Sequence, residues 1–532
     1  MQFVFTRAFA RSILFASLIV VLAAKASHAW AGPADAPAKA MPDYVPPPII
    51  FTNCEENEAL ECGTLTVPVD YRHPAGETVG LAVIRAQATI PDRRIGILIG
   101  NPGGPGFSAV DFILAGVHAP IFTSVNQFFD IVGFDPRGVA RSAPVKCEVE
   151  PAGDPAELDP SERAAFFDEF SARVANACLE QNGPFILSLS TNNAARDMDT
   201  LRRALGEEQI TYAGVSAGTY LGAAYASMFP ERVRAMILDS AVAPEFRDNY
   251  VEFNSEQAAA FELVFQHIDS LCAENVSCRL HDIGVVRALD ELMARLAAEP
   301  VTSPGGVVLT DVEVRNVVAN ALYSEFDWPL IIGTLADALD GDYRFFFANA
   351  AGATNLIRLA LNTTTFDSYD AMVCNDDGTR RPAAEHLRVD DTRGKLFPRF
   401  FGPFYVSGEV ARCAAWAPAD LPVIRNVRGR LGAPILFYGN DFDPATPLTW
   451  TRSMAHALGF ERSIVRYEGG GHGIVTNSNR CIDAITKDYL FDLKLPPEGT
   501  TCPALLGTDE IARPADVADE ARWDWASAVG AR

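Results

Sequence analysis

Three residues in this chain combine reactive side chains with positions next to short apolar runs. Ser216 lies in the pentapeptide GVSAG, Asp443 comes soon after the run APILFYG, and His472 lies in GGGHG. A serine hydroxyl becomes a strong nucleophile when a histidine takes its proton, and a carboxylate orients that histidine. The order Ser, Asp, His along the chain therefore indicates nucleophilic catalysis by such a triad.

The sequence around Ser216 fits a nucleophile on a sharp turn between a strand and a helix. GVSAG has the form G-x-S-x-G, in which small residues stand two positions before and after the serine because the turn is tight. ITYA before the motif is strand-like, and TYLGAAYASMF after it is helix-like. The first amides of that helix would point at the nucleophile. A serine that only shapes a turn is the alternative interpretation.

His472 is the candidate base because of its surroundings. It follows a strand-like run directly, and the glycines around it would let a loop reach the nucleophile. The other histidines lie in loops or helices without a comparable turn, or in the N-terminal leader, and we expect them to be surface or core residues. They are His28, His73, His118, His267, His281, His386 and His456.

Two aspartates compete for the role of the acid. Asp441 and Asp443 both lie in NDFDPATP, after the strand-like run that precedes the one leading to His472. The third member of a triad belongs at the end of such a strand, and we expect it to be Asp443. Asp441 is the alternative acid, although it also fits an Asx-turn or a helix entry.

An oxyanion hole needs backbone amides that point at the developing alkoxide. One is expected from Ala217, the residue after the nucleophile. The other is expected from the turn NPGGPG (101–106), with Gly104 as first choice and Gly103 beside it. This turn lacks the GxGxxG and GK[ST] spacing of phosphate-binding loops. The sequence gives no sign of a cofactor or a catalytic metal.

The elements around these residues predict an α/β fold with a helical insertion. Strand-like runs alternate with helical stretches up to about residue 243 and again after about 431, which is typical of a mostly parallel sheet with helices on both faces. Between them the patterns are almost entirely those of amphipathic helices. We therefore predict a core formed by residues 45–243 and 426–510, and a helical cap formed by residues 244–425.

Residues 1–31 have the pattern of a secretory signal peptide. Arg7 and Arg11 precede an apolar run of about 13 residues, and small residues at Ala29 and Ala31 offer cleavage sites. A membrane anchor is the alternative, but a spanning helix needs about 20 residues. We expect a protein that is secreted or periplasmic, without a stable membrane anchor.

Ten cysteines follow this leader, and an even number in an exported protein favours disulfides. Neither CxxC nor zinc-finger spacing occurs, so a metal site is not expected. Many connectivities are possible, and sequential pairing is the simplest. It gives Cys54–Cys62, Cys147–Cys178, Cys272–Cys278, Cys374–Cys413 and Cys481–Cys502.

Composition narrows the classes of partner. The chain has 532 residues, of which 48% are hydrophobic, and its formal net charge is −24. Nucleic acids and anionic membrane surfaces select basic patches, so neither is an expected partner. A peptide or a small acyl compound remains as the substrate, and the sequence does not indicate an oligomeric state.

Taken together, these motifs resemble one family. GGPG after a strand, GFDPRGVARS, GVSAGT, DPATP and GGGHG are arranged as in the α/β-hydrolase peptidases of the prolyl-aminopeptidase family, and the chain is most similar to the secreted tripeptidyl-aminopeptidase-like branch. Three positions differ from the common pattern. Ala217 replaces an aromatic residue, Ser240 replaces a glycine, and GVARS replaces GTGRS.

The resemblance implies an α/β-hydrolase fold and a secreted serine hydrolase that removes residues from peptide N-termini. A carboxylesterase for small exported or envelope esters would use the same triad and is the alternative. A catalytically inactive binding protein on the same scaffold is a third hypothesis.

An exopeptidase must also bind the ammonium group of its substrate, and an unpaired buried charge is costly. The cap supplies acidic candidates, which are Glu245, Glu252, Glu325, Asp327, Asp376 and Asp377. Asp376 is the preferred anchor because a Cys374 bridge would hold its loop and because the resembling family is acidic there. The alternative for each of these residues is a place on a solvated acidic surface.

Overall fold

The computed structural model describes residues 44–116, 120–149, 158–248, 250–349, 364–393, 396–397, 399–400, 413–418, 420–475, 479–508 and 510–512. The signal peptide predicted for residues 1–31 lies outside these ranges. Within them, no helix combines the length and the hydropathy that a membrane span requires.

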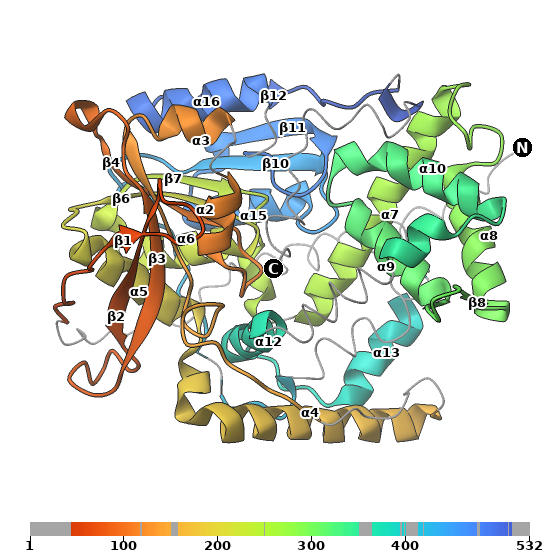
Figure 1. Ribbon diagram of the computed structural model, residues 1–532, viewed down its shortest axis with the longest axis horizontal. Helices are drawn as coiled ribbons and strands as arrows, with labels where there is room; N and C mark the ends of the chain where they lie inside the picture. Colours follow the sequence, from red (N-terminus) through yellow and green to blue (C-terminus); the bar gives the residue numbers. More distant parts are fainter. Residues whose placement is uncertain are drawn as a thin grey trace, which may run out of the picture. The chain divides into compact units, whose positions relative to one another are not determined.

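A ten-stranded sheet runs through the described part of the chain (Figure 1). Its strands in spatial order are β1 (Thr52–Asn53), β2 (Glu61–Pro68), β3 (Thr78–Ala86), β5 (Phe129–Phe134), β4 (Gly96–Asn101), β6 (Ile210–Val215), β7 (Val233–Asp239), β10 (Leu436–Phe442), β11 (Ile464–Gly470) and β12 (Thr501–Cys502). The pairs from β1 to β5 are antiparallel, and all pairs from β5 to β12 are parallel. The predicted, mostly parallel α/β sheet is confirmed.

Every run that the sequence predicted as a strand forms one, namely β4, β5, β6, β7, β10 and β11. The antiparallel strands β2 and β3 were not predicted. Strands buried on both faces read as continuous apolar runs, whereas antiparallel strands near an edge alternate between apolar and polar residues. β4 and β5 are buried along their whole length, but β2 and β3 include partly exposed positions.

Helices cover both faces of the sheet. One face packs on α5 (Thr191–Ala204), α6 (Ala217–Met228) and α15 (Leu448–Leu458), and the other on α2 (Ala109–Gly116), α3 (Pro120–Val125) and α16 (Arg480–Asp492). β7 shows why one strand serves both layers. Met236 and Leu238 join the first apolar cluster, and Ala235 and Ile237 join the second, because successive side chains point to opposite faces.

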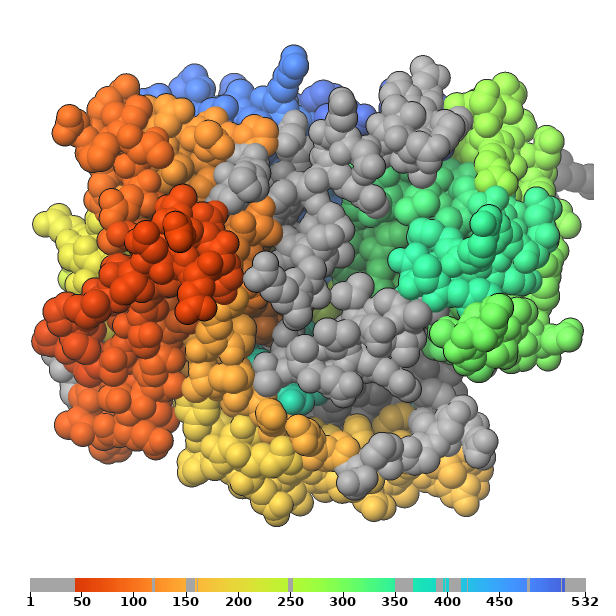
Figure 2. Space-filling view, in the orientation of Figure 1, coloured from red at the N-terminus to blue at the C-terminus, as the bar shows by residue number. Residues whose placement is uncertain are grey.

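The chain between β7 and β10 is largely helical. It forms α7 (Tyr250–Glu274), α8 (Val285–Ala298), α9 (Asp311–Ala321), α10 (Trp328–Leu339), α12 (Thr364–Asp376) and α13 (Ala383–Arg393). Two short strands, β8 (Val301–Thr302) and β9 (Val308–Leu309), pair only with each other. Helices α7 to α10 share a separate apolar cluster, so this region has a core of its own. In the space-filling view α8–α10 (green) and β1–β3 (red to orange) lie at opposite sides of the molecule's face (Figure 2).

The structure contains all five disulfides that sequential pairing predicted. Two of them, Cys147–Cys178 and Cys374–Cys413, lie in one buried apolar cluster, which we call the junction cluster. It joins α12 of the cap to α4 (Pro160–Asn182) and to the segment that precedes α5.

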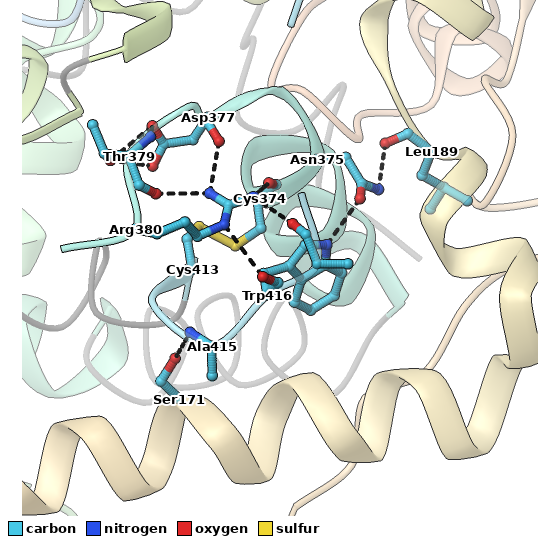
Figure 3. The surroundings of a disulfide bond; sticks show 11 residues. Ser171, Leu189, Cys374, Asn375, Asp377, Thr379, Arg380, Cys413, Ala415 and Trp416 are labelled. Atoms are coloured by element: carbon cyan, nitrogen blue, oxygen red, sulfur yellow. Dashed lines mark hydrogen bonds between the residues drawn. A yellow bond between two sulfur atoms is a disulfide. The ribbon is translucent and has the colours of Figure 1, made fainter. Parts of the chain in front are cut away.

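Hydrogen bonds reinforce the junction cluster (Figure 3). The Trp416 indole donates to Asn375 Oδ1 at 2.8 Å, and the Asn375 amide donates to the Leu189 carbonyl at 2.8 Å. The Ala415 amide donates to Ser171 Oγ on α4 at 3.0 Å. The Cys374–Cys413 disulfide therefore lies where the cap meets core helices, and not inside the cap alone.

Candidate active site

Ser216 occupies a strained turn between β6 and α6. Its backbone has φ 56° and ψ −127°, a conformation that costs a non-glycine residue free energy and is typical of functional turns. A Cβ atom on Gly214 would lie 2.5 Å from the Gly218 carbonyl oxygen, and one on Gly218 would lie 2.7 Å from the Asn101 carbonyl oxygen. Both glycines of G-x-S-x-G are therefore required for space, as the sequence predicted.

Backbone contacts within the core hold this turn in place. The Ser216 amide donates to the Asp239 carbonyl of β7 at 3.0 Å, and the Thr219 amide donates to the Ser216 carbonyl at 2.9 Å. The Tyr212 hydroxyl of β6 donates to the Gly218 carbonyl at 2.7 Å. These backbone bonds position the candidate nucleophile on β6, β7 and α6.

Asp443 and His472 form a buried pair at the ends of β10 and β11. His472 Nδ1 lies 3.0 Å and 3.1 Å from the two carboxylate oxygens of Asp443. Asp443 also accepts from the amides of Ala445 and Thr446, both at 2.9 Å, and from the Thr446 hydroxyl at 2.9 Å. A proton on Nδ1 shared with this carboxylate leaves Nε2 to accept a proton, which is the tautomer that a general base needs.

Asp441 is engaged elsewhere. Its carboxylate forms a bidentate ion pair with Arg466 of β11, with both N···O distances at 2.5 Å. Asp443 immediately follows Phe442, the last residue of β10, and its side chain reaches the buried end of the sheet. The structure therefore brings His472 together with Asp443, the preferred acid, and pairs Asp441 with Arg466.

The turn after β4 lies against the Ser216 turn. A Cβ atom on Gly103 would lie 2.5 Å from the Val215 carbonyl oxygen, so only glycine allows this approach. The Gly103 amide donates to Asn101 Oδ1 at 3.0 Å, whereas the Gly104 amide forms no hydrogen bond within the described residues. Ala217 is the first residue of α6, and its amide lies outside the helical hydrogen-bond pattern. Gly104 and Ala217 remain the two candidate oxyanion donors.

The end of β7 connects the two halves of the site, which sequence reasoning missed. Asp239 Oδ2 accepts from the amides of Ile474 and Val475 at 2.7 and 2.8 Å, just beyond His472. Burial raises the pKa of the Asp239 carboxyl to about 6. The same residue binds the Ser216 amide through its carbonyl. The position of Asp239 could have indicated this role, because the residue ends a parallel strand at the same sheet edge as the other candidates.

Ser240 takes part in the same connection. It has φ 54°, a region that favours glycine, and this explains why the resembling family often has glycine there. Its hydroxyl accepts from the Gly473 amide at 2.9 Å. The serine in this chain therefore adds a hydrogen bond to the loop of the candidate base.

The cap acids proposed as ammonium anchors have internal partners. Asp376 accepts from the Thr191 amide at 3.0 Å and from its hydroxyl at 2.5 Å, at the N-terminus of α5, and burial raises the pKa of Asp376 to about 8. Asp377 accepts from Thr379, and Glu245 accepts from Ser453. No hydrogen bond within the described residues joins Asp376 to Ser216, Asp443 or His472.

Two family models match successive parts of the chain, and both extend into the predicted cap. The model described as alpha/beta hydrolase fold matches residues 97–323, which include the Ser216 turn and the candidate oxyanion turn. The model described as TAP-like protein matches residues 398–502, which include Asp443 and His472.

Curated relatives align over most of the chain. Serine protease Hip1 of Mycobacterium tuberculosis is 32% identical over 467 residues, which cover 83% of this chain and 87% of the relative. Tripeptidyl aminopeptidase of Streptomyces lividans is 30% identical over 458 residues and 83% of each chain. Carboxylesterase B of M. tuberculosis is 30% identical over 475 residues, 85% of this chain and 88% of the relative. The chain therefore belongs to the TAP-like branch of the α/β-hydrolase family and is a serine hydrolase.

Proposed function

We propose that this hydrolase is an exopeptidase that releases residues from peptide N-termini through Ser216, His472 and Asp443. The observation that carries the proposal is the buried Asp443–His472 pair, at the same edge of the sheet as a strained Ser216 turn. That edge is formed by the carboxyl ends of β6, β7, β10 and β11. Ligands of open α/β sheets bind at the carboxyl ends of the strands.

In this mechanism His472 Nε2 takes the proton of Ser216 Oγ while Oγ attacks the substrate carbonyl carbon. The amides of Gly104 and Ala217 donate to the oxyanion that forms. His472 then gives its proton to the leaving amine, the C–N bond breaks, and an acyl-enzyme remains. Water, deprotonated by His472, hydrolyses the ester and restores Ser216. Asp443 holds the Nδ1–H tautomer and stabilises the imidazolium at each step.

The preference for peptides rests on the named activities of two relatives, Hip1 and the tripeptidyl aminopeptidase. The preference for an N-terminal cut also needs a group that binds the substrate ammonium. Asp376 would have to release Thr191 and ionise despite its burial before it could act as that anchor. The other five cap acids stay alternatives for this anchor, and Glu245, Glu325 and Asp377 have internal hydrogen-bond partners as Asp376 does.

A carboxylesterase is the second candidate function because a relative bears that name and the triad cannot distinguish the two. Purified protein should be assayed on peptide nitroanilides with free and with acetylated N-termini and on nitrophenyl acyl esters. An exopeptidase cleaves the free peptides far faster than the acetylated ones. Equal cleavage of both peptides, or activity on esters alone, would contradict the proposal. Ser216→Ala, which lacks the proposed nucleophile, is the negative control for every substrate.

We also propose that the protein is exported. Five disulfides are typical of oxidising compartments, and the leader has the pattern of a signal peptide. The mature N-terminus, determined by mass spectrometry of the periplasmic and medium fractions, should begin shortly after Ala29 or Ala31. An uncleaved N-terminus in the cell would contradict export by this route.

A further inference from the structure

A short segment of the cap lies directly against the loop that carries His472. This segment, residues 322–328, connects α9 to α10, and we call it the cap loop. We call residues 469–473 the base loop. The His472 amide donates to the Tyr323 carbonyl at 2.8 Å, and the two aromatic rings meet edge to face with centroids 5.5 Å apart. The backbone of the candidate base is thus bonded to the cap.

The three glycines before His472 make room for the cap loop. A Cβ atom on Gly469 would lie 2.7 Å from Glu325 Oε2, one on Gly470 would lie 2.2 Å from the Trp328 ring, and one on Gly471 would lie 2.9 Å from the Tyr323 carbonyl oxygen. Only Gly471 has a positive φ, 88°, so the conformation of the loop does not explain the other two glycines. Close contact with the cap explains Gly470 and Gly471. At Gly469 the ring of Tyr467 in β11 would lie nearer still to such a Cβ atom, at 2.4 Å, and adds to the contact with Glu325.

Glu325 connects the cap loop to the base loop and β11 through hydrogen bonds. Its side chain is buried, and its two oxygens bind different partners on β11. Oε2 accepts from the Gly470 amide at 3.1 Å, and Oε1 accepts from the Tyr467 hydroxyl. That hydroxyl in turn accepts from the Leu505 amide at 2.9 Å. The carboxylate therefore fixes β11 at both ends of the short stretch that leads to His472.

We propose that Glu325 is a positioning residue for the catalytic base: from the cap, it holds residues 467–470 so that the His472 ring stays aligned with Ser216. The inference rests on the proposed triad. It makes the cap part of the machinery that aligns the base, in addition to any role in covering the substrate.

Ionisation of Glu325 controls this contact. Both partners donate to the carboxylate, so the ionised form accepts both hydrogen bonds. In the protonated form one oxygen carries the proton, and the Tyr467 hydroxyl, which already accepts from the Leu505 amide, would have to accept it as well. Burial raises the pKa of Glu325 to about 7. The titratable group facing it from β11 is Tyr467, whose pKa burial and the adjacent carboxylate raise, and Glu325 forms no ion pair within the described residues. Alignment of the base is therefore lost as pH falls through about 7.

The test is Glu325→Gln, which keeps the size of the side chain but is neutral at every pH. We expect kcat on a peptide nitroanilide to fall about 10- to 100-fold while KM changes less than about threefold, because the substrate is still bound but the base is misaligned. The acid limb of the wild-type kcat profile should reflect two protons, and that of Glu325→Gln only one. Glu313→Gln is the matched control, since this cap residue closes the capping box at the start of α9 and forms no hydrogen bond to β11 within the described part of the chain.

Tyr467→Phe gives a second, milder measurement. It removes one hydrogen bond to Glu325 and keeps the ring, so kcat should fall less than in Glu325→Gln, and the double variant should be no slower than Glu325→Gln alone. If Glu325→Gln does not fold, an unchanged kcat in Tyr467→Phe overturns the inference. An unchanged kcat or an unchanged pH profile in folded Glu325→Gln also overturns it. Activity that survives Ser216→Ala or His472→Ala would instead refute the triad itself.

Discussion

The two halves of the candidate active site are built differently. The Ser216 turn is held by neighbours in the sheet and in α6, and its geometry follows from two glycines within two residues of it. The base loop and the two residues that follow it are held from two directions. Asp239 and Ser240 of the core bind residues 473–475, and Tyr323 and Glu325 of the cap bind His472 and Gly470. The nucleophile is therefore a local structure, whereas the base depends on the assembly of distant parts of the chain.

This difference predicts how substitutions in each half affect turnover. Changes at the Ser216 turn should abolish turnover without involving the cap. Changes in the cap should reach catalysis through the base loop and leave the Ser216 turn intact. The following predictions test this contrast.

The largest effect is expected from Ser216→Ala. Turnover on any substrate should fall at least about 10³-fold, since the nucleophile is removed, while the melting temperature stays close to that of the wild type. Steady-state kinetics and thermal unfolding measure the two quantities. A residual rate above about one-thousandth of wild type would point to another nucleophile.

The two aspartates at the end of β10, Asp441 within the strand and Asp443 just after it, should differ sharply. Asp443→Asn should lower kcat by about 10³-fold or more, because the amide favours the wrong tautomer of His472. Asp441→Asn removes an exposed ion pair with Arg466, worth at most about 1 kcal/mol, and should leave kcat within a few-fold of wild type. The reverse ranking in a side-by-side assay would refute the assignment of the acid.

Gly470→Ala tests the contact between the cap and the base loop by steric means. The added methyl would lie 2.2 Å from the Trp328 ring, so one loop must move, and we expect kcat to fall about 10-fold or more. The control is Gly333→Ala in α10 of the cap, where the nearest atom is 3.9 Å away and alanine favours the helix by about 1 kcal/mol. Equal kcat in both variants would show that the base loop adapts freely.

Removal of the Cys374–Cys413 disulfide should loosen the junction cluster. Because the two cysteines are 39 positions apart, loss of their disulfide should lower the free energy of unfolding by about 2–4 kcal/mol, and limited proteolysis should cut the cap before the core. Replacing both Cys272 and Cys278, which are six residues apart, is the matched control with a smaller expected loss. Cleavage in the core first would contradict this order.

The smallest effect concerns Asp376. As a partner of Thr191 at the start of α5, its replacement by Asn should lower stability by at most about 2 kcal/mol and change peptide and ester turnover equally. As an ammonium anchor, the same change would lower kcat/KM for free peptides about 10- to 100-fold and spare esters. The hydrogen bonds with Thr191 favour an equal effect on peptide and ester turnover. Assays of the same variant on both substrates distinguish the two outcomes.

The features that the sequence predicted have local signatures. The Ser216 turn needs two nearby glycines, buried parallel strands appear as continuous apolar runs, and Asp443 and His472 directly follow such runs. Glu325 and Asp239 act on β11 and the base loop over separations of more than 100 residues, and no short pattern marks such contacts. Asp376 lies two residues after Cys374 in α12, so its side chain points about 200° around the helix from that cysteine, and it contacts α5. The role of Asp376 as an ammonium anchor stays a prediction.

The three glycines of the base loop also constrain how such enzymes can be recombined. A cap taken from a relative would carry that relative's cap loop. The side chains of this loop would have to fit against the residues that precede the histidine in the chain that receives the cap. Chimaeras that exchange residues 244–425 alone should therefore express as folded but slow enzymes, and co-transfer of residues 467–473 should restore them. During evolution, a change of substrate preference in the cap would therefore be accompanied by changes in residues 467–473. The cap and this stretch would be exchanged between relatives together.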